Sequence, residues 1–151
     1  MIALGLSALS VLLIWFYKRP IAQGHDDFER MNEDEELKKI YHKTIQLLND
    51  KKYFLNKNVK LSHLAAEIGH NERLVSKAIN TYGSGNFNKF LNTFRVDYSK
   101  QLLIGGEFDH YTIEAIAEES GFSNKVSFYN SFKSHVGMSP SEYKRSKQVK
   151  N

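Results

Sequence analysis

Two groups of side chains recur at helical spacing in the second half of the chain, and both could contact the edges of DNA bases. The first recognition face consists of Arg73, Ser76, Lys77 and Asn80. The second recognition face consists of Lys125, Val126, Tyr129, Asn130 and Lys133. Arginine donates two hydrogen bonds to guanine, asparagine pairs in the same way with adenine, and an apolar side chain packs on the methyl group of thymine. These residue types therefore favour base recognition over catalysis.

The first recognition face belongs to a pattern that predicts a helix-turn-helix. A short apolar stripe over residues 61–68 is followed by Gly69, which can leave a helix in the left-handed conformation without steric cost. Asn71 is a suitable N-cap for a second helix. The apolar face of that helix is formed by Leu74, Val75, Ala78 and Ile79. Two short helices around a glycine turn are typical of this motif, and the backbone N–H groups at Asn71 could bind a phosphate.

The same pattern returns about 52 positions later. Ile116-Ala117 repeats Leu64-Ala65, and Gly121 repeats Gly69. Ser123 is predicted to cap the next helix and to mark a second phosphate-binding N-terminus, while Phe128 and Phe132 face the core. A correctly phased pair of such units is far more specific than a single one.

A connector helix is predicted between the two units. An apolar stripe runs from residue 86 to residue 103 and contains Phe87, Phe90, Leu91, Phe94, Tyr98 and Leu102. These 18 residues correspond to about 27 Å of helix, which could separate two recognition helices for successive major-groove turns about 34 Å apart. After the second unit, Ser139, Pro140 and Glu142 predict a capping box for a last helix over residues 141–146.

The N-terminus predicts a transmembrane helix over residues 1–17, which carry no charge. Its 16 residues after Met1 would span about 24 Å, against roughly 30 Å of hydrocarbon. The aromatic residues at 15–17 followed by Lys18-Arg19 favour a single-pass protein whose C-terminal part lies in the cytoplasm. A buried helix, or the end of a longer protein's last span, remains as an alternative.

A charged linker is expected over residues 18–36 and a membrane-proximal helix and loop over residues 37–58. That helix is predicted from about residue 33 to residue 48, and its apolar stripe is expected to pack on the following domain rather than to form a dimer seam. The stripe consists of Leu37, Ile40, Tyr41, Thr44 and Leu48. The helix-turn-helix domain is expected over residues 59–147, with a basic tail at 148–151.

The composition excludes several chemistries. The chain has no cysteine, which rules out disulfides and every cysteine-based metal site. Its six histidines show no metal-ligand spacing, and no phosphate-binding glycine loop or nucleophile–base arrangement occurs. We therefore expect no enzyme, no cofactor, no metal and no small-molecule substrate. A net charge of +4 mildly favours an anionic partner.

From Leu61 to Arg145 the sequence resembles the DNA-binding domain of AraC/XylS-type transcription regulators. The resemblance rests on Leu64-Ala65, Gly69, Phe90, Arg95, Ile116-Ala117, Gly121-Phe122-Ser123, Phe128, Phe132-Lys133 and the run from Gly137 to Arg145. It implies that Arg73, Ser76 and Lys77 contact bases in one half-site, and Lys125, Val126 and Asn130 in the other. The apolar run before the domain resembles the membrane-tethered members typical of Bacteroidetes-like bacteria.

Three positions depart from the family pattern. Lys60 stands where the family often has a capping Ser or Thr, so a looser start of the first helix is expected. Val126 and Asn130 make the second recognition face less electrostatic, which favours weaker binding by the second unit. Arg95 is expected to pair with a carboxylate inside the domain rather than to contact DNA.

The predicted fold is all-α, with two helix-turn-helix subdomains on a long connector helix, preceded by a transmembrane helix and linker. The predicted function is sequence-specific binding of double-stranded DNA to regulate transcription. Activation is the expected direction, with RNA polymerase as a partner, a homodimer as the assembly, and the chain tethered to the cytoplasmic membrane as the output domain of a larger sensor. The alternative is a helix-turn-helix pair that serves as a protein-interaction module without DNA binding.

Overall fold

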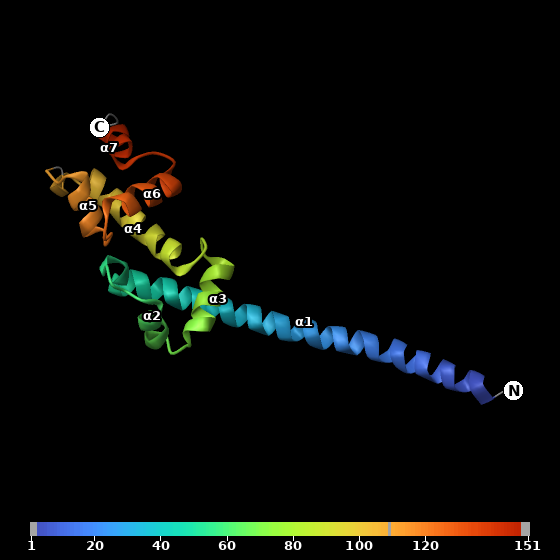
Figure 1. The fold of residues 1–151 in the computed structure, drawn as a ribbon. Coiled ribbons are helices and arrows are strands. Elements are labelled where there is room, and N and C mark those ends of the chain that lie inside the picture. The colour runs from blue at the N-terminus through green and yellow to red at the C-terminus, as the bar shows by residue number, and fades with distance from the viewer. Residues whose placement is uncertain (1–2, 109, 149–151) are drawn as a thin grey trace. The chain divides into compact units, whose positions relative to one another are not determined.

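The computed structural model describes residues 3–108 and 110–148, and all regular elements in these residues are helical (Figure 1). This confirms the predicted all-α class. The chain divides into two compact units, Met1–Glu36 and Leu37–Asn151. The first unit consists of the N-terminal part of α1 (Ala3–Lys51), and the second contains the remaining helices.

The segment expected as a charged linker, residues 18–36, is helical as part of α1. Its Glu, Arg, Gln, Met and Ala residues are good helix formers. Pro20 and Gly24 are the two residues that disfavour a helix most strongly there. The absence of an apolar period therefore does not mark an irregular backbone in this segment.

Within the described residues, none of the helices combines the length and the apolar character needed to cross a bilayer. The predicted location, a single-pass protein of the cytoplasmic membrane, is therefore wrong. The uncharged run that suggested it falls short of the roughly 30 Å hydrocarbon core even as a full helix, and Lys18, Arg19 and Pro20 follow it at once. Residues 1–2 of that run lie outside the described residues.

The first core of the second unit is built by the end of α1, a 3-10 turn η1 (Tyr53–Leu55), α2 (Leu61–Glu67) and α3 (Glu72–Tyr82). Leu37, Ile40 and Leu48 of α1 are buried in this core, as is Thr44, whose hydroxyl donates to the carbonyl of Ile40 at 2.8 Å. The predicted stripe therefore packs on the domain, as expected. Lys60 precedes α2 without a side-chain cap, in agreement with the expected looser start.

The connector α4 (Phe87–Ile104) has 18 residues, as predicted, and begins one residue later than the predicted stripe. Its buried side chains serve both cores. Phe90 and Leu91 lie in the first core, whereas Val96, Leu102 and Leu103 lie in the second. A short turn, η2 (Gly106–Phe108), follows. One rigid helix therefore carries both helix-turn-helix units.

The second core is formed by α4, α5 (Ile113–Glu119), α6 (Lys125–Val136) and α7 (Pro140–Gln148). Phe128 and Phe132 are fully buried, as predicted, and Phe132 packs edge-on against Tyr143 with ring centroids 5.6 Å apart. The capping box is confirmed: the amide of Ser139 donates to Glu142 Oε2 at 2.7 Å, and the amide of Glu142 donates to Ser139 Oγ at 3.3 Å. Residues 149–151 of the predicted basic tail lie outside the described residues.

Among the described residues Arg95 pairs with no carboxylate and donates to backbone carbonyls instead, which corrects the prediction made for it. Its Nε donates to the carbonyl of Phe54 at 2.7 Å, and its NH2 group donates to the carbonyl of Asn56 at 3.1 Å. The guanidinium also lies over the ring of Phe122, 5.7 Å from the centroid. Burial lowers the pKa of Arg95. The residue lies inside the domain, as expected, and its acceptors are carbonyls of η1 and of the residue that follows it, which the sequence pattern did not reveal.

Candidate nucleic-acid interface

The first recognition face lies on the outer side of α3. The Asn71 side chain accepts from the amide of Leu74 at 2.9 Å and fixes the start of the helix, as predicted. Val75, Ala78 and Ile79 are fully buried. On the opposite side Arg73, Lys77 and Asn80 are exposed, and Ser76 is half-buried. The buried side of α3 thus leaves three of the four predicted side chains accessible to a ligand.

The second recognition helix, α6, begins one residue later than expected. Asn124, not Ser123, is the N-cap, and its side chain accepts from the amide of Ser127 at 2.8 Å. Ser123 is exposed and lies before the cap. The repeat itself carried the signal: the offset is 52 residues between Gly69 and Gly121 but 53 between Val75 and Phe128. One extra residue in the second turn shifts the cap from Ser123 to Asn124.

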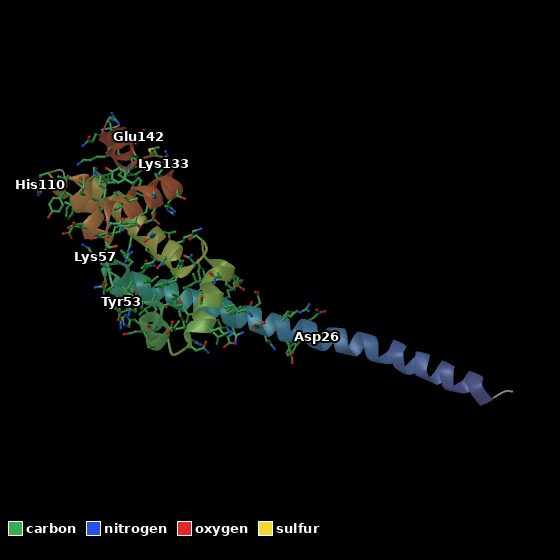
Figure 2. The ribbon with its side chains drawn as sticks, in the orientation of Figure 1. Asp26, Tyr53, Lys57, His110, Lys133 and Glu142 are labelled. Carbon is green, nitrogen blue, oxygen red and sulfur yellow. The ribbon has the colours of Figure 1, made fainter. Side chains whose placement is uncertain are left out.

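The second recognition face combines exposed and partly packed side chains. Lys125, Asn130 and Lys133 are exposed, and Val126 is 69% exposed. Tyr129 is half-buried, with its ring 5.7 Å from that of Phe128. Lys133 lies in the C-terminal part of α6 (Figure 2). An isolated valine that is exposed to this degree is available for contact with another molecule.

Lys125 is engaged within the domain. Its ammonium forms an ion pair with Glu114 of α5 and lies over the ring of Tyr129, 5.6 Å from the centroid. The hydrogen bond with Glu114 raises the pKa of Lys125, and the same bond lowers the pKa of Glu114. Sequence spacing does not reveal this pair because Glu114 and Lys125 lie on different helices. Before Lys125 can contact DNA, it must exchange this carboxylate for a new acceptor.

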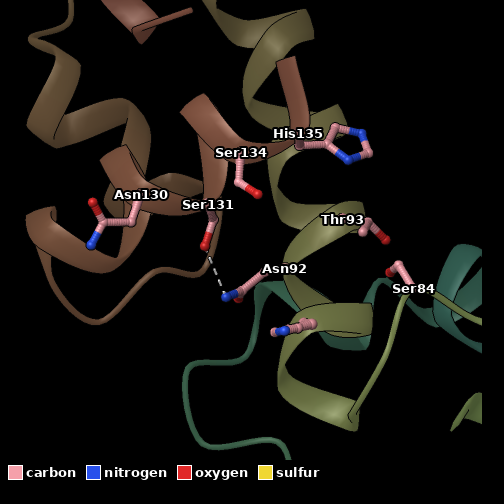
Figure 3. Close-up of a pocket in the computed structure, with 8 residues that line it drawn as sticks. Ser84, Asn92, Thr93, Asn130, Ser131, Ser134 and His135 are labelled. Atoms are coloured by element: carbon pink, nitrogen blue, oxygen red, sulfur yellow. Dashed lines mark hydrogen bonds between the residues drawn. The ribbon is translucent and has the colours of Figure 1, made fainter. Parts of the chain in front are cut away.

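A polar groove of about 440 Å³ lies between α6, the first half of α4 and the loop that follows α3 (Figure 3). We call it the inter-unit groove, because it lies between the two helix-turn-helix units; all of its residues belong to the compact unit Leu37–Asn151. It is lined by Ser84, Lys89, Asn92, Thr93, Asn130, Ser131, Ser134 and His135. The side-chain amide of Asn92 donates from Nδ2 to Ser131 Oγ at 3.1 Å and so joins α4 to α6. Of these residues, only Asn130 was predicted as a site residue; the others come together through the packing of α6 on α4.

The chain matches a family model described as "Helix-turn-helix domain" over residues 64–146. It is 30% identical over 115 residues to an uncharacterised HTH-type transcriptional regulator of Staphylococcus aureus (strain COL). This match covers 70% of this chain and 15% of that protein. It is 32% identical over 89 residues to the TCP pilus virulence regulatory protein of Vibrio cholerae, covering 59% of this chain and 31% of that protein. The chain therefore spans a minor part of these relatives.

Solved structures share the fold. The C-terminal domain of AraT, a response regulator from Geobacillus stearothermophilus, has a TM-score of 0.59 and 24% identity, with 71% of this chain and 84% of that chain covered. The DNA-binding domain of AdpA, solved in complex with a target DNA, has a TM-score of 0.60 and 18% identity, with 74% and 95% covered.

The double helix-turn-helix architecture defines the class of protein. The chain belongs to the AraC-type helix-turn-helix family of transcription regulators. The similarity is to regulators and not to enzymes, in agreement with the sequence analysis.

Proposed function

We propose that this chain binds double-stranded DNA in a sequence-specific manner through α3 and α6 and thereby regulates transcription. The observation that carries the proposal is the matched pair of recognition helices, each buried on its apolar side and exposed on its polar side, attached to a single rigid connector. The related AdpA domain, which has the same fold, was solved with a target DNA.

The side chains suggest a division of labour. Arg73 can donate two hydrogen bonds to a guanine, while Val126 and Asn130 suit a thymine methyl group and an adenine. Ser76, Lys77, Asn80 and Tyr129 complete the two faces as further proposed base contacts. Lys125 and Lys133 would neutralise phosphates and release counterions, which makes binding dependent on salt. The starts of α3 at Asn71 and of α6, next to Ser123, could offer backbone N–H groups to phosphates.

Selection of bound duplexes from a random pool with the full chain tests this proposal. We expect enrichment of one motif with two half-sites about one helical turn apart, and a steep loss of affinity as salt rises. Enrichment of a single short half-site would contradict the participation of both helices. Failure to retain any duplex at low salt would contradict DNA binding itself.

The second candidate function is a protein-interaction module. It is favoured by the modest charge of residues 58–151, where 12 basic and 9 acidic residues give +3, and by the pairing of Lys125 with Glu114. Such a module would bind no duplex under any salt condition, so the same experiment separates the two functions. Activation, contact with RNA polymerase and assembly as a homodimer stay predictions from the sequence.

A further inference from the structure

The inter-unit groove has the chemistry of an anion-binding surface. All eight lining residues carry hydrogen-bond donors, and among the described residues that line it none is acidic. One lining residue contacts a carboxylate: Nε2 of His135 lies 3.4 Å from Oδ1 of Asp97. Asp97 is also bound by Lys100 at 2.8 Å, so its charge is already balanced.

Lys89 is the only lysine or arginine among the lining residues. It is exposed in the first turn of α4 and forms no ion pair with any described residue. Lys51, Lys100 and Lys125, by contrast, are each paired with a carboxylate. The Lys89 ammonium is therefore available to an external anion.

The groove also has a defined place relative to the recognition helices. Asn130, one of its lining residues, belongs to the second recognition face, and Ser84 follows the end of α3. Two recognition helices in successive major-groove segments must be separated by a stretch of sugar–phosphate backbone. That stretch of sugar–phosphate backbone would face the protein surface between α3 and α6, where the groove lies.

We propose that the inter-unit groove binds the sugar–phosphate backbone between the two major-groove segments of a bound duplex. Lys89 neutralises one phosphate, and Ser84 and Ser134 supply further hydrogen-bond donors. This inference rests on the proposed DNA binding and adds a contact that carries no sequence information. It assigns to α4 a direct part in affinity besides its role as a connector.

The test compares Lys89→Gln with Lys43→Gln in the full chain, using a selected duplex and an unrelated duplex of the same length. Lys43 is a matched control because it is an exposed lysine on α1 in the same unit and lies outside the groove. For Lys89→Gln we expect about fivefold weaker binding to both duplexes near physiological salt, and a plot of log affinity against log salt that is shallower by about 0.9. Lys43→Gln should leave the slope unchanged. Ser134→Glu, which places a carboxylate in the groove, should weaken both complexes further.

Three results would overturn the inference. If Lys89→Gln binds both duplexes with the wild-type salt slope, the groove does not hold a phosphate, while the proposed function stands. If Lys43→Gln changes the slope as much as Lys89→Gln does, the effect is a diffuse one of net charge. If the wild-type chain binds neither duplex at low salt, the proposed function and this inference fail together.

Discussion

At the scale of single residues, the two recognition faces differ in how their cations are held. Arg73 is exposed on α3, whereas Lys125 is engaged by Glu114 and by the ring of Tyr129. Val126 and Asn130 are uncharged residues in the middle of the second recognition face. The first helix-turn-helix unit should therefore supply more of the electrostatic attraction to DNA. The second helix-turn-helix unit should supply more of the selection among base sequences by shape.

Replacing Arg73 by alanine should relax specificity within one half-site. A bidentate contact with guanine contributes about 1–3 kcal/mol of discrimination at one base pair, so the loss should concentrate at a single position of the motif. Lys133→Ala is the comparison, since a phosphate contact weakens all sequences about equally. Binding to a library of single-base variants measures both effects. A uniform loss for Arg73→Ala across the library would show that its side chain does not contact a base.

Glu114→Gln should strengthen DNA binding, because it releases Lys125 from its carboxylate. The gain is expected to be about fivefold at most, since exposed ion pairs are weak. The pKa of Glu114 lies below its usual range, so the carboxylate stays charged and the pair stays intact across neutral pH; the gain should therefore be constant there and vanish only as acid protonates Glu114.

Glu118→Gln provides the matched control for this change. Glu118 lies on the same helix, is exposed, and forms no ion pair with a described residue. Both variants remove one negative charge, so their difference isolates the pairing with Lys125. Equal gains in titrations with the selected duplex would mean that the pair does not restrain binding.

At the scale of elements, the caps determine where each recognition helix begins. Asn124→Ala should lower the free energy of unfolding by about 0.5–2 kcal/mol, because it removes the acceptor for the amide of Ser127. Ser123→Ala should change it by much less. Denaturant titration of both variants measures the free energy of unfolding. A larger loss of stability for Ser123→Ala than for Asn124→Ala would show that Ser123 is the N-cap after all.

Much of this element structure follows from the sequence alone. The connector, the inward pair Phe128 and Phe132, and the capping box at Ser139 could be predicted because burial and capping leave local patterns that a reader of the sequence can count. The position of the second cap was misplaced because the repeat gains one residue within its turn. The partners of Arg95 and Lys125 could not be predicted, since both contacts join residues that are brought together only by tertiary packing.

At the scale of the whole compact unit Leu37–Asn151, the turn of the second helix-turn-helix, at Gly121, contacts Phe54 and Leu55, which follow α1. Gly121 has φ +85°, and a Cβ at this position would collide with the carbonyl of Phe54 and lie 2.9 Å from the Cα of Leu55. Arg95 donates to the carbonyls of Phe54 and Asn56, and its guanidinium lies over the ring of Phe122, the residue after Gly121. The two cores are thus joined by backbone contacts as well as by α4.

Gly121→Ala should therefore lower the free energy of unfolding by more than the strain of a positive φ alone, which is about 1–2 kcal/mol. Gly137→Ala is the control, because Gly137 has φ +83° but has open space around its Cβ position. Thermal unfolding of both variants measures the difference. Equal losses would indicate that the Phe54 loop yields to a methyl group without cost.

The junction formed by Phe54, Arg95 and Gly121 also bears on how this unit melts. Phe54 belongs to the first core, and its carbonyl is contacted by Arg95 and by the turn at Gly121 of the second helix-turn-helix. Neither half can therefore unfold without breaking contacts of the other. Heat should therefore disrupt both halves in one cooperative transition rather than in two steps. For the proposed binding to two half-sites at a fixed spacing, such cooperativity would preserve the separation of α3 and α6 until the whole unit unfolds.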